Sequence, residues 1–164
     1  MTSPFRTERL SKQDRSDFRS GVEPLDRYFR NQVGQDVRRR MAVCIVALEA
    51  ETDALAGFYT LSAADIAVDA VPEQLTRKLP RYPTLPAARL GRLAVDERFR
   101  GRGLGGALLH DAVLRTVGTD LGIHAMVVDA KDAAAEAFYR HHGFEAYGST
   151  QGTLIAPLSR LIAS

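Results

Sequence analysis

Alternating apolar and polar positions predict several short strands. The runs Ala42–Glu49 and Leu55–Ile66 are separated by Glu51-Thr52-Asp53, which suits a turn. Together they predict an antiparallel hairpin. Phe5–Leu10 predicts a short opening strand ahead of it.

Helical spacing dominates the segment between the opening strand and the hairpin. Pro24 suits a first helical turn. In the helix that starts at Val22, the residues at helical spacing are Leu25, Tyr28, Phe29, Gln32 and Val33. Ser11–Asp14 predicts the cap of a shorter helix that runs to Phe18. Pro72–Leu75 predicts another helix start, and the prolines of Leu79–Pro86 predict a stiff, extended connector.

The C-terminal half alternates strand, helix, strand, helix and strand. The predicted strands are Ala88–Val95, Ile123–Asp129, Phe144–Tyr147 and Thr153–Leu158, and the predicted helices are Leu104–Val117 and residues 132–142. Asp132 suits a helix N-cap, and Gly143 suits the position just after a helix end. This order predicts an α/β sheet with one parallel pair of strands around residues 100–106.

Composition fits one globular domain over residues 1–164, with 45% hydrophobic and 26% charged residues. No apolar run approaches the roughly 18 residues of a membrane span, and the first residues lack the apolar stretch of a signal peptide. The single cysteine, Cys44, lies in an apolar run and is expected to be buried and inert. A reducing cytoplasmic setting fits this cysteine usage.

The net charge of +2 conceals an uneven distribution. Residues 1–40 carry a balance of +4, residues 77–102 carry +6, and the remainder carries −8. Of the 22 basic residues, 19 are arginine, whose planar fork suits phosphate. Two interpretations stay open for these segments: ordinary solvated surface, or contact with a polyanion.

The glycine-rich segment Arg100–Gly106 lies between a predicted strand and a predicted helix. Glycines let the backbone approach a ligand closely, and a helix N-terminus attracts anions. Together these features predict a pyrophosphate cradle, with a purely structural turn as the alternative. The segment lacks Gly-Lys-Ser/Thr, which excludes a P-loop. Asp120 precedes a strand, whereas the ribose-binding acid of a dinucleotide fold should end one.

Three motifs resemble the GNAT N-acetyltransferase superfamily. Arg100-x-x-Gly103-x-Gly105 resembles its acetyl-CoA motif, Arg92–Val95 resembles the preceding strand, and Ala137–Phe144 resembles the late helix that ends in Phe-Tyr-x-x-x-Gly-Phe. The resemblance covers about residues 40–158. It implies a mixed, mostly antiparallel sheet with helices on both faces. That sheet would be splayed between the strands at Leu93 and Val127, with pantetheine in the gap.

The resemblance also assigns site residues. Tyr139 corresponds to the tyrosine beside the CoA sulfur and becomes the candidate general acid; the alternative is that it only packs. A backbone N–H in the stretch Leu93–Val95 would stabilise the oxyanion. The implied acetyl-CoA contacts are Leu93, Ala94, Val95, Arg100, Gly101, Arg102, Gly103, Leu104, Gly105, Gly106, Asp132 and Phe138.

Softer motifs resemble one GNAT subgroup, the acetyltransferase toxins of bacterial toxin–antitoxin modules. These motifs are Gly21-x-x-x-Leu25-Asp26, Gly57–Ser62, Leu79–Pro83 and Gly91–Asp96. The subgroup acetylates the amino group of aminoacyl-tRNA, blocks translation, tends to dimerise and pairs with a ribbon-helix-helix antitoxin. One departure is Ser20, where the subgroup often has cysteine.

The basic segments then become candidates for holding tRNA phosphates. The candidates are Arg38, Arg39, Arg40, Arg77, Lys78, Arg81 and Arg89. No histidine or cysteine spacing predicts a metal site. The possible general bases, none of them compelling, are Glu97, Asp129, Glu136 and His142. Two rivals remain: a GNAT enzyme for a small amine or a protein N-terminus, and a CoA-binding regulatory domain without activity.

Overall fold

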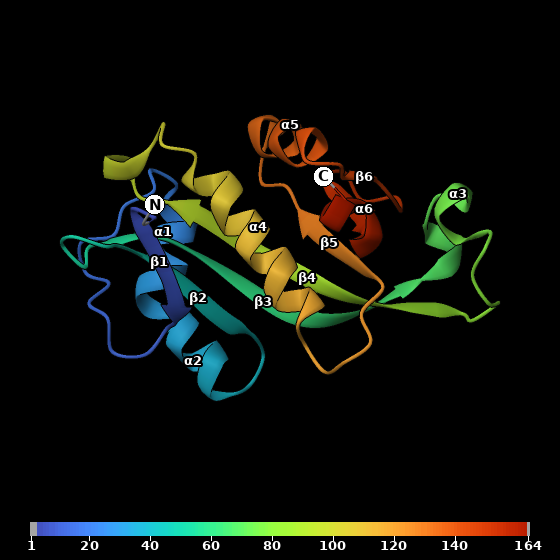
Figure 1. Cartoon of the computed structure of the whole chain (residues 1–164), viewed down its shortest axis with the longest axis horizontal. Coiled ribbons are helices and arrows are strands. Elements are labelled where there is room, and N and C mark those ends of the chain that lie inside the picture. Colours follow the sequence, from blue (N-terminus) through green and yellow to red (C-terminus); the bar gives the residue numbers. More distant parts are fainter. Residues whose placement is uncertain (1–2, 164) are drawn as a thin grey trace. The chain divides into compact units, whose positions relative to one another are not determined.

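A computed structural model describes residues 3–163 and contains one mixed sheet (Figure 1). Its strands are β1 (Phe5–Arg9), β2 (Val43–Glu49), β3 (Leu55–Ala67), β4 (Thr84–Val95), β5 (Ala125–Asp129), β6 (Glu145–Ala146) and β7 (Thr153–Pro157). They follow the order β1-β2-β3-β4-β5-β7-β6. β4 and β5 pair in parallel, whereas β1–β2, β2–β3, β5–β7 and β6–β7 pair antiparallel. The predicted mixed, mostly antiparallel sheet, its hairpin and its parallel pair are confirmed.

The described residues also form six α-helices and two short 3-10 helices, all but the last helix lying between strands in the sequence. They are α1 (Glu23–Asn31), α2 (Val33–Arg38), η1 (Val68–Ala70), α3 (Glu73–Thr76), η2 (Glu97–Phe99), α4 (Leu104–Val117), α5 (Ala133–His141) and α6 (Leu158–Ala163). The predicted bounds of α4 are confirmed residue for residue. The helix from Val22 is interrupted at Gln32, whose φ of −120° leaves the helical range. Helix α6 was not predicted.

One prediction was wrong: Ser11–Phe18 forms no helix. Local polar side chains bond the backbone instead, since Gln13 accepts from the Ser11 N–H at 2.6 Å and Asp14 accepts from the Ser16 N–H at 2.9 Å. Side-chain bonds of this kind compete with helix formation. The Arg15 guanidinium further holds this segment by donating to the Phe29 carbonyl at 2.7 Å.

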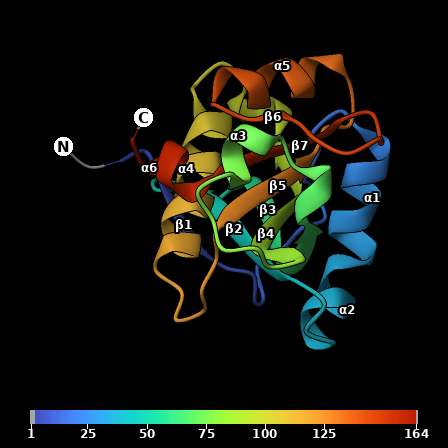
Figure 2. The same ribbon diagram turned by 90° about the vertical axis from the view of Figure 1, so that its right-hand side faces the viewer.

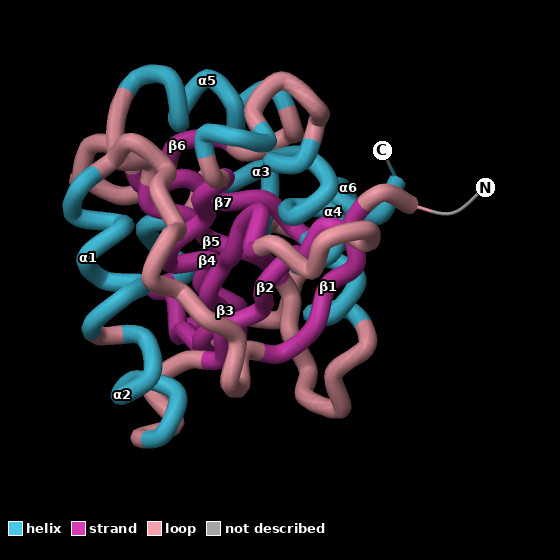
Figure 3. The backbone as a smooth tube through the Cα atoms, turned by 90° about the vertical axis from the view of Figure 1, so that its left-hand side faces the viewer, coloured by secondary structure: helices cyan, strands magenta, loops and turns pink. Residues whose placement is uncertain are grey.

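The chain divides into two compact units. One contains the residues up to Ser62 together with Gly91–Ala112, and the other contains Ala63–Leu90 together with the residues from Val113 onward. In the first unit β1, β2 and β3 lie side by side (Figure 3). Asp111 of α4 accepts from the hydroxyls of Thr7 at 2.9 Å and Tyr59 at 2.6 Å, so α4 is fixed to strands β1 and β3.

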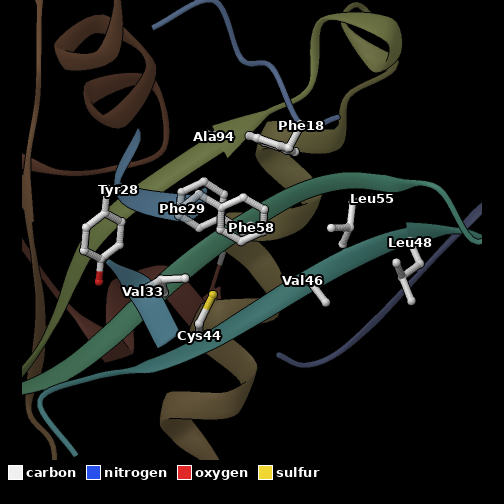
Figure 4. Close-up of a cluster of buried hydrophobic side chains, with 10 residues drawn as sticks. All are labelled: Phe18, Tyr28, Phe29, Val33, Cys44, Val46, Leu48, Leu55, Phe58 and Ala94. Carbon is white, nitrogen blue, oxygen red and sulfur yellow. The ribbon is translucent and has the colours of Figure 1, made fainter. Parts of the chain in front are cut away.

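An aromatic cluster forms a core of the first unit (Figure 4). Phe29 stacks on Phe58 with 4.1 Å between ring centroids, and Phe18 meets Phe29 edge-on at 4.8 Å. Ala94 of β4 belongs to the same cluster. Cys44 also lies here, 2% exposed, and burial raises the pKa of its thiol to about 12. The expected burial of this cysteine is confirmed.

The second unit has its own apolar core. β7 pairs with β5 on one side and with β6 on the other (Figure 2). Buried residues from β3, β4, β5 and β7 gather there together with Val71, and Leu75 and Leu79 pack against them. The predicted connector Leu79–Pro86 is shorter than expected, because β4 already begins at Thr84.

Candidate active site

The last residues of β4 are held firmly by the core of the first unit. Ala94 is buried, whereas Leu93 and Val95 on either side of it are partly exposed. β3 approaches β4 closely here, since a Cβ on Gly57 would lie 2.9 Å from the Ala94 carbonyl oxygen. The Arg92 N–H donates to the Thr60 hydroxyl at 3.1 Å. The strand end Leu93–Val95 is therefore held in place, with the side chains of Leu93 and Val95 partly exposed.

Asp96 organises the turn that follows. Its carboxylate is buried and accepts from the N–H groups of Arg19 at 3.0 Å and Arg98 at 2.9 Å, and from the Arg98 guanidinium at 2.9 Å. Burial alone would raise the pKa of Asp96, but these hydrogen bonds outweigh it and the pKa is lowered. The sequence suggested only that a strand ends here.

The glycine turn leads directly from η2 into α4 (Figure 1). Gly101 and Gly103 both have φ of +75°, a left-handed conformation that favours glycine. Apart from the chain neighbours of each glycine, a Cβ built on either would meet no atom of residues 3–163 within 4 Å. The backbone therefore borders open space just before the N-terminus of a 14-residue helix. Such a turn fits an anionic ligand.

The two arginines of the turn are engaged within their own unit. Arg100 donates to the Ser20 carbonyl and lies 3.9 Å from Glu97. Arg102 lies 3.3 Å from the Glu49 carboxylate, with its guanidinium 4.8 Å from the centroid of the Phe5 ring. Each arginine thus has a carboxylate partner, a neutralisation that the sequence did not predict.

Tyr139 lies in the second unit, on α5. Asp132 caps this helix by accepting from the Ala135 N–H at 2.8 Å, which gives Asp132 a structural role whatever else it contacts. Tyr139 is 6% exposed, and its ring meets those of Phe138 at 5.2 Å and Phe144 at 5.6 Å. Burial, together with the charge of Asp129, raises the pKa of its phenol. Within residues 3–163 the hydroxyl forms no hydrogen bond, so it is a protonated donor without an acceptor.

The candidate bases differ in their surroundings. Asp129 pairs with Arg89 at 2.9 Å, and Glu136 lies 3.4 Å from Arg140. Glu97 lies beside Arg100. The pKa of His142 is lowered by burial and by neighbouring His141. None of these groups is distinguished as a base.

The candidate phosphate-binding residues fall into two kinds. Arg38, Arg39 and Arg40 are exposed at the end of α2, and Arg77, Lys78 and Arg81 are exposed between α3 and β4. None of these six forms an ion pair within the described residues. Arg89 differs, since Asp129 neutralises it.

Sequence reasoning missed one group beside the site strand. The Arg92 guanidinium lies over the Tyr28 ring, and the Tyr28 hydroxyl donates to Asp36 at 2.7 Å. Arg92 belonged to a predicted motif, but its partners come from a distant helix pair, which no local pattern indicates.

The fold and the glycine turn define an acetyltransferase. Residues 40–146 match the family model of the acetyltransferase (GNAT) domain, and the chain belongs to this family. It is 35% identical over 134 residues to the tRNA-acetylating toxin of Mycobacterium tuberculosis, covering 80% of this chain and 78% of that protein.

Solved structures agree with this assignment. AtaT complexed with acetyl-methionyl-tRNAfMet has a TM-score of 0.86 at 25% identity, over 97% of this chain and 98% of that one. A KacT mutant has a TM-score of 0.89 at 23% identity, over 98% and 99% of the two chains, and shares the fold.

Neither a membrane span nor a metal site is found among the described residues. No helix among residues 3–163 is long and apolar enough to cross a bilayer. In the same part of the chain, no three or more acidic, histidine or cysteine side chains are grouped to hold a metal ion.

Proposed function

We propose that the protein transfers an acetyl group from acetyl-CoA to the amino group of an aminoacyl-tRNA and so acts as a toxin that blocks translation. The observation that carries this proposal is the 35% identity to a tRNA-acetylating toxin over most of both chains. The similar AtaT structure with an acetylated aminoacyl-tRNA supports the same acceptor.

Acetyl-CoA would bind at the glycine turn and the adjoining strand. Backbone N–H groups of Gly101–Gly106, at the start of α4, would face the pyrophosphate. The open space beside Gly101 and Gly103 supports this fit. Leu93 and Val95 would pair through their backbones with the pantetheine amides, with Ala94 anchoring the strand from the core. From α5, Phe138 would line the cofactor, while Asp132 would contribute mainly as the helix cap.

Tyr139 would act as general acid. In acetyl transfer the amine nitrogen bonds to the thioester carbonyl carbon, the carbon–sulfur bond breaks, and the amine loses a proton. The Tyr139 hydroxyl would supply the proton that the departing sulfur takes up, and solvent would restore it. A raised phenol pKa keeps that proton in place at neutral pH. A backbone N–H in the stretch Leu93–Val95 would stabilise the oxyanion.

The acceptor amine explains why no strong base is required. Free α-amino groups have a pKa of about 8, and an adjacent ester lowers this pKa further. Such an amine is largely neutral at cell pH. The exposed cations at the end of α2 and before β4 would hold the tRNA phosphates. A cationic small amine would gain nothing from these unpaired positive charges, so they favour tRNA over that rival.

The remaining features of the proposal follow the subgroup. Residues 1–164 would form one acetyltransferase domain that works in the cytoplasm without a metal. A ribbon-helix-helix antitoxin and a second copy of the chain would be its partners.

The direct test is mass spectrometry of aminoacylated tRNA after incubation with the protein and isotope-labelled acetyl-CoA. The expected result is labelled acetyl-aminoacyl ends in the wild type and near-background labelling with Tyr139→Phe. A mixture of small amines and peptide N-termini is the matched control. Label that enters only this control mixture would contradict the proposed acceptor.

A further inference from the structure

Tyr82 is a conspicuous exposed aromatic residue in the second unit. It lies on the connector between α3 and β4 and is 66% exposed. The segment that carries it lies beside α3, at the end of β3 and the start of β4 (Figure 1). Within the described residues its ring has no aromatic partner and its hydroxyl forms no hydrogen bond. A single exposed aromatic ring does not by itself mark a binding surface, so the residues around Tyr82 decide what it can bind.

The connector holds Tyr82 rigidly. Leu79 packs against the core before it, and Leu85 is buried after it. Between these anchors, the Tyr82 N–H donates to the Pro80 carbonyl at 2.9 Å, and the Pro83 carbonyl accepts from Val68 at 3.0 Å. Two prolines with fixed φ flank the ring. The backbone that carries the ring is therefore ordered before binding, so little backbone entropy is lost when a ligand binds.

The charges around Tyr82 define the chemistry of the ligand. Arg77, Lys78 and Arg81 are exposed on the same connector, and none of them pairs with an acid among residues 3–163. An exposed aromatic ring among unpaired cations is the combination that binds single-stranded nucleic acid, in which cations hold phosphates and the ring stacks on a base. Duplex recognition needs the cations alone.

We propose that Tyr82 is a stacking platform for an unpaired base of the nucleic-acid acceptor. This inference rests on the proposed function, because it assigns the single-stranded end of the tRNA to this connector. Two readouts separate the stacking from the acetyl transfer itself.

The first readout is fluorescence, and it needs no activity. The chain contains no tryptophan, so Tyr82→Trp introduces a single reporter at the platform. A short single-stranded RNA should quench it, and a blunt RNA duplex of equal phosphate content should not. Leu121→Trp is the matched control, since Leu121 is 68% exposed on the same unit but lies away from the cations in sequence. Equal quenching by duplex and single strand, or none by either, overturns the proposal. A reporter that responds only to an acidic protein partner overturns it as well.

The second readout is kinetic. Tyr82→Ala should lower kcat/KM for aminoacyl-tRNA by about 5- to 150-fold, the usual effect of losing one stacked base, mainly through KM. Tyr82→Phe should restore it, and Leu121→Ala should leave it unchanged. Turnover of an aminoacyl methyl ester, which has no base, should not respond to Tyr82→Ala. An unchanged kcat/KM for aminoacyl-tRNA in Tyr82→Ala overturns the stacking role while leaving the proposed function intact. A wild-type protein that acetylates no aminoacyl-tRNA refutes the proposed function, and the fluorescence readout then decides the platform alone.

Discussion

The guanidinium of Arg92 lies over the ring of Tyr28, with 3.6 Å between its Cζ atom and the ring centroid. Arg92 immediately precedes Leu93, and Tyr28 is buried in α1. The Tyr28 hydroxyl in turn holds Asp36 of α2. This contact joins the first two helices to the strand end of the candidate site, and Asp36 supplies the charge opposite Arg92.

A double-mutant cycle should detect this coupling. Arg92→Met and Tyr28→Leu are each expected to lower the free energy of unfolding, and the pair should lose about 0.5–2 kcal/mol less than the sum. The loss of the Tyr28–Asp36 hydrogen bond cancels from the coupling energy, because this bond is absent in both the Tyr28→Leu protein and the double variant. Urea unfolding measures the four values. If the two losses of unfolding free energy add strictly, the contact between Arg92 and Tyr28 contributes nothing to stability.

Asp96→Asn should destabilise the protein in a pH-dependent way. The pKa of Asp96 is lowered in the folded state. Its contribution to the free energy of unfolding is therefore fully present above the pKa of an unfolded aspartate, about 3.9, and is lost as pH falls through the folded pKa. Loss of the charge from a buried, hydrogen-bonded site should cost about 2 kcal/mol at pH 7. The gap between wild type and variant should shrink below about pH 4. Asp65→Asn, at an exposed position, is the control, and a gap that does not depend on pH argues against a charged Asp96.

Gly103→Glu should abolish acetyl-CoA binding. A carboxylate at the turn would repel the pyrophosphate. The fold should survive, since no described residue other than the chain neighbours lies within 4 Å of the new Cβ. Isothermal titration calorimetry measures the affinity. Gly148→Glu is a close match, because Gly148 has φ of +69° and equally open surroundings but lies after β6. It should carry the same backbone cost, about 1 kcal/mol, and bind normally. Normal binding by a folded Gly103→Glu protein would remove the turn from the cofactor site.

Tyr139→Phe should lower kcat by about 10²–10⁴-fold and leave acetyl-CoA affinity unchanged. The ring contacts with Phe138 and Phe144 survive the change, so thermal stability should hardly move. The raised phenol pKa adds a second expectation. Since Tyr139 stays protonated, wild-type kcat should show no fall between about pH 7 and 9. Near-normal turnover in Tyr139→Phe would return this residue to a packing role.

The combined change of Arg77, Lys78 and Arg81 to Ala should weaken tRNA binding and flatten its salt dependence, because fewer counterions are released. Melting temperature should change little, since exposed charges without partners contribute little to stability. The control is a triple variant that removes the same charge from exposed positions elsewhere, with Ala at Arg9, Lys12 and Arg27. Filter binding across a salt series gives both slopes. Equal slopes in the two variants would mean that the connector is only solvated surface.

Local signals were sufficient for much of the fold. Glycines before Leu104 and the apolar spacing behind it fixed the bounds of α4, and Asp132 capped α5 as expected. Gly143, with φ of +102°, follows the helix end as predicted. These features depend on residues a few positions apart, which is the range over which sequence patterns operate.

Long-range contacts account for what the sequence left out. Asp96 becomes a buried hub only because the Arg19 N–H reaches it from 77 residues away. Arg100 was expected to offer charge to a ligand, yet it bonds the Ser20 carbonyl. In the segment Ser11–Phe18, where a helix was expected, Arg15 adds a long-range anchor by donating to the Phe29 carbonyl. In each case the partner comes from another part of the chain, so composition and local spacing could not indicate the contact.

At Gly103, where the backbone is left-handed, a side chain would have two effects: it would strain the backbone, and it would fill space in front of the turn. Natural L-residues always produce both effects together. An L-residue there is strained by its handedness and also narrows the open space in front of the turn. A D-alanine introduced by chemical ligation would accept φ of +75° without strain, and its methyl group would replace the other α-hydrogen of this glycine. If the turn serves folding alone, the mirror-image residue should be harmless or stabilising. If a phosphate must come close to this backbone, the same methyl group should leave a well-folded protein that binds its cofactor poorly.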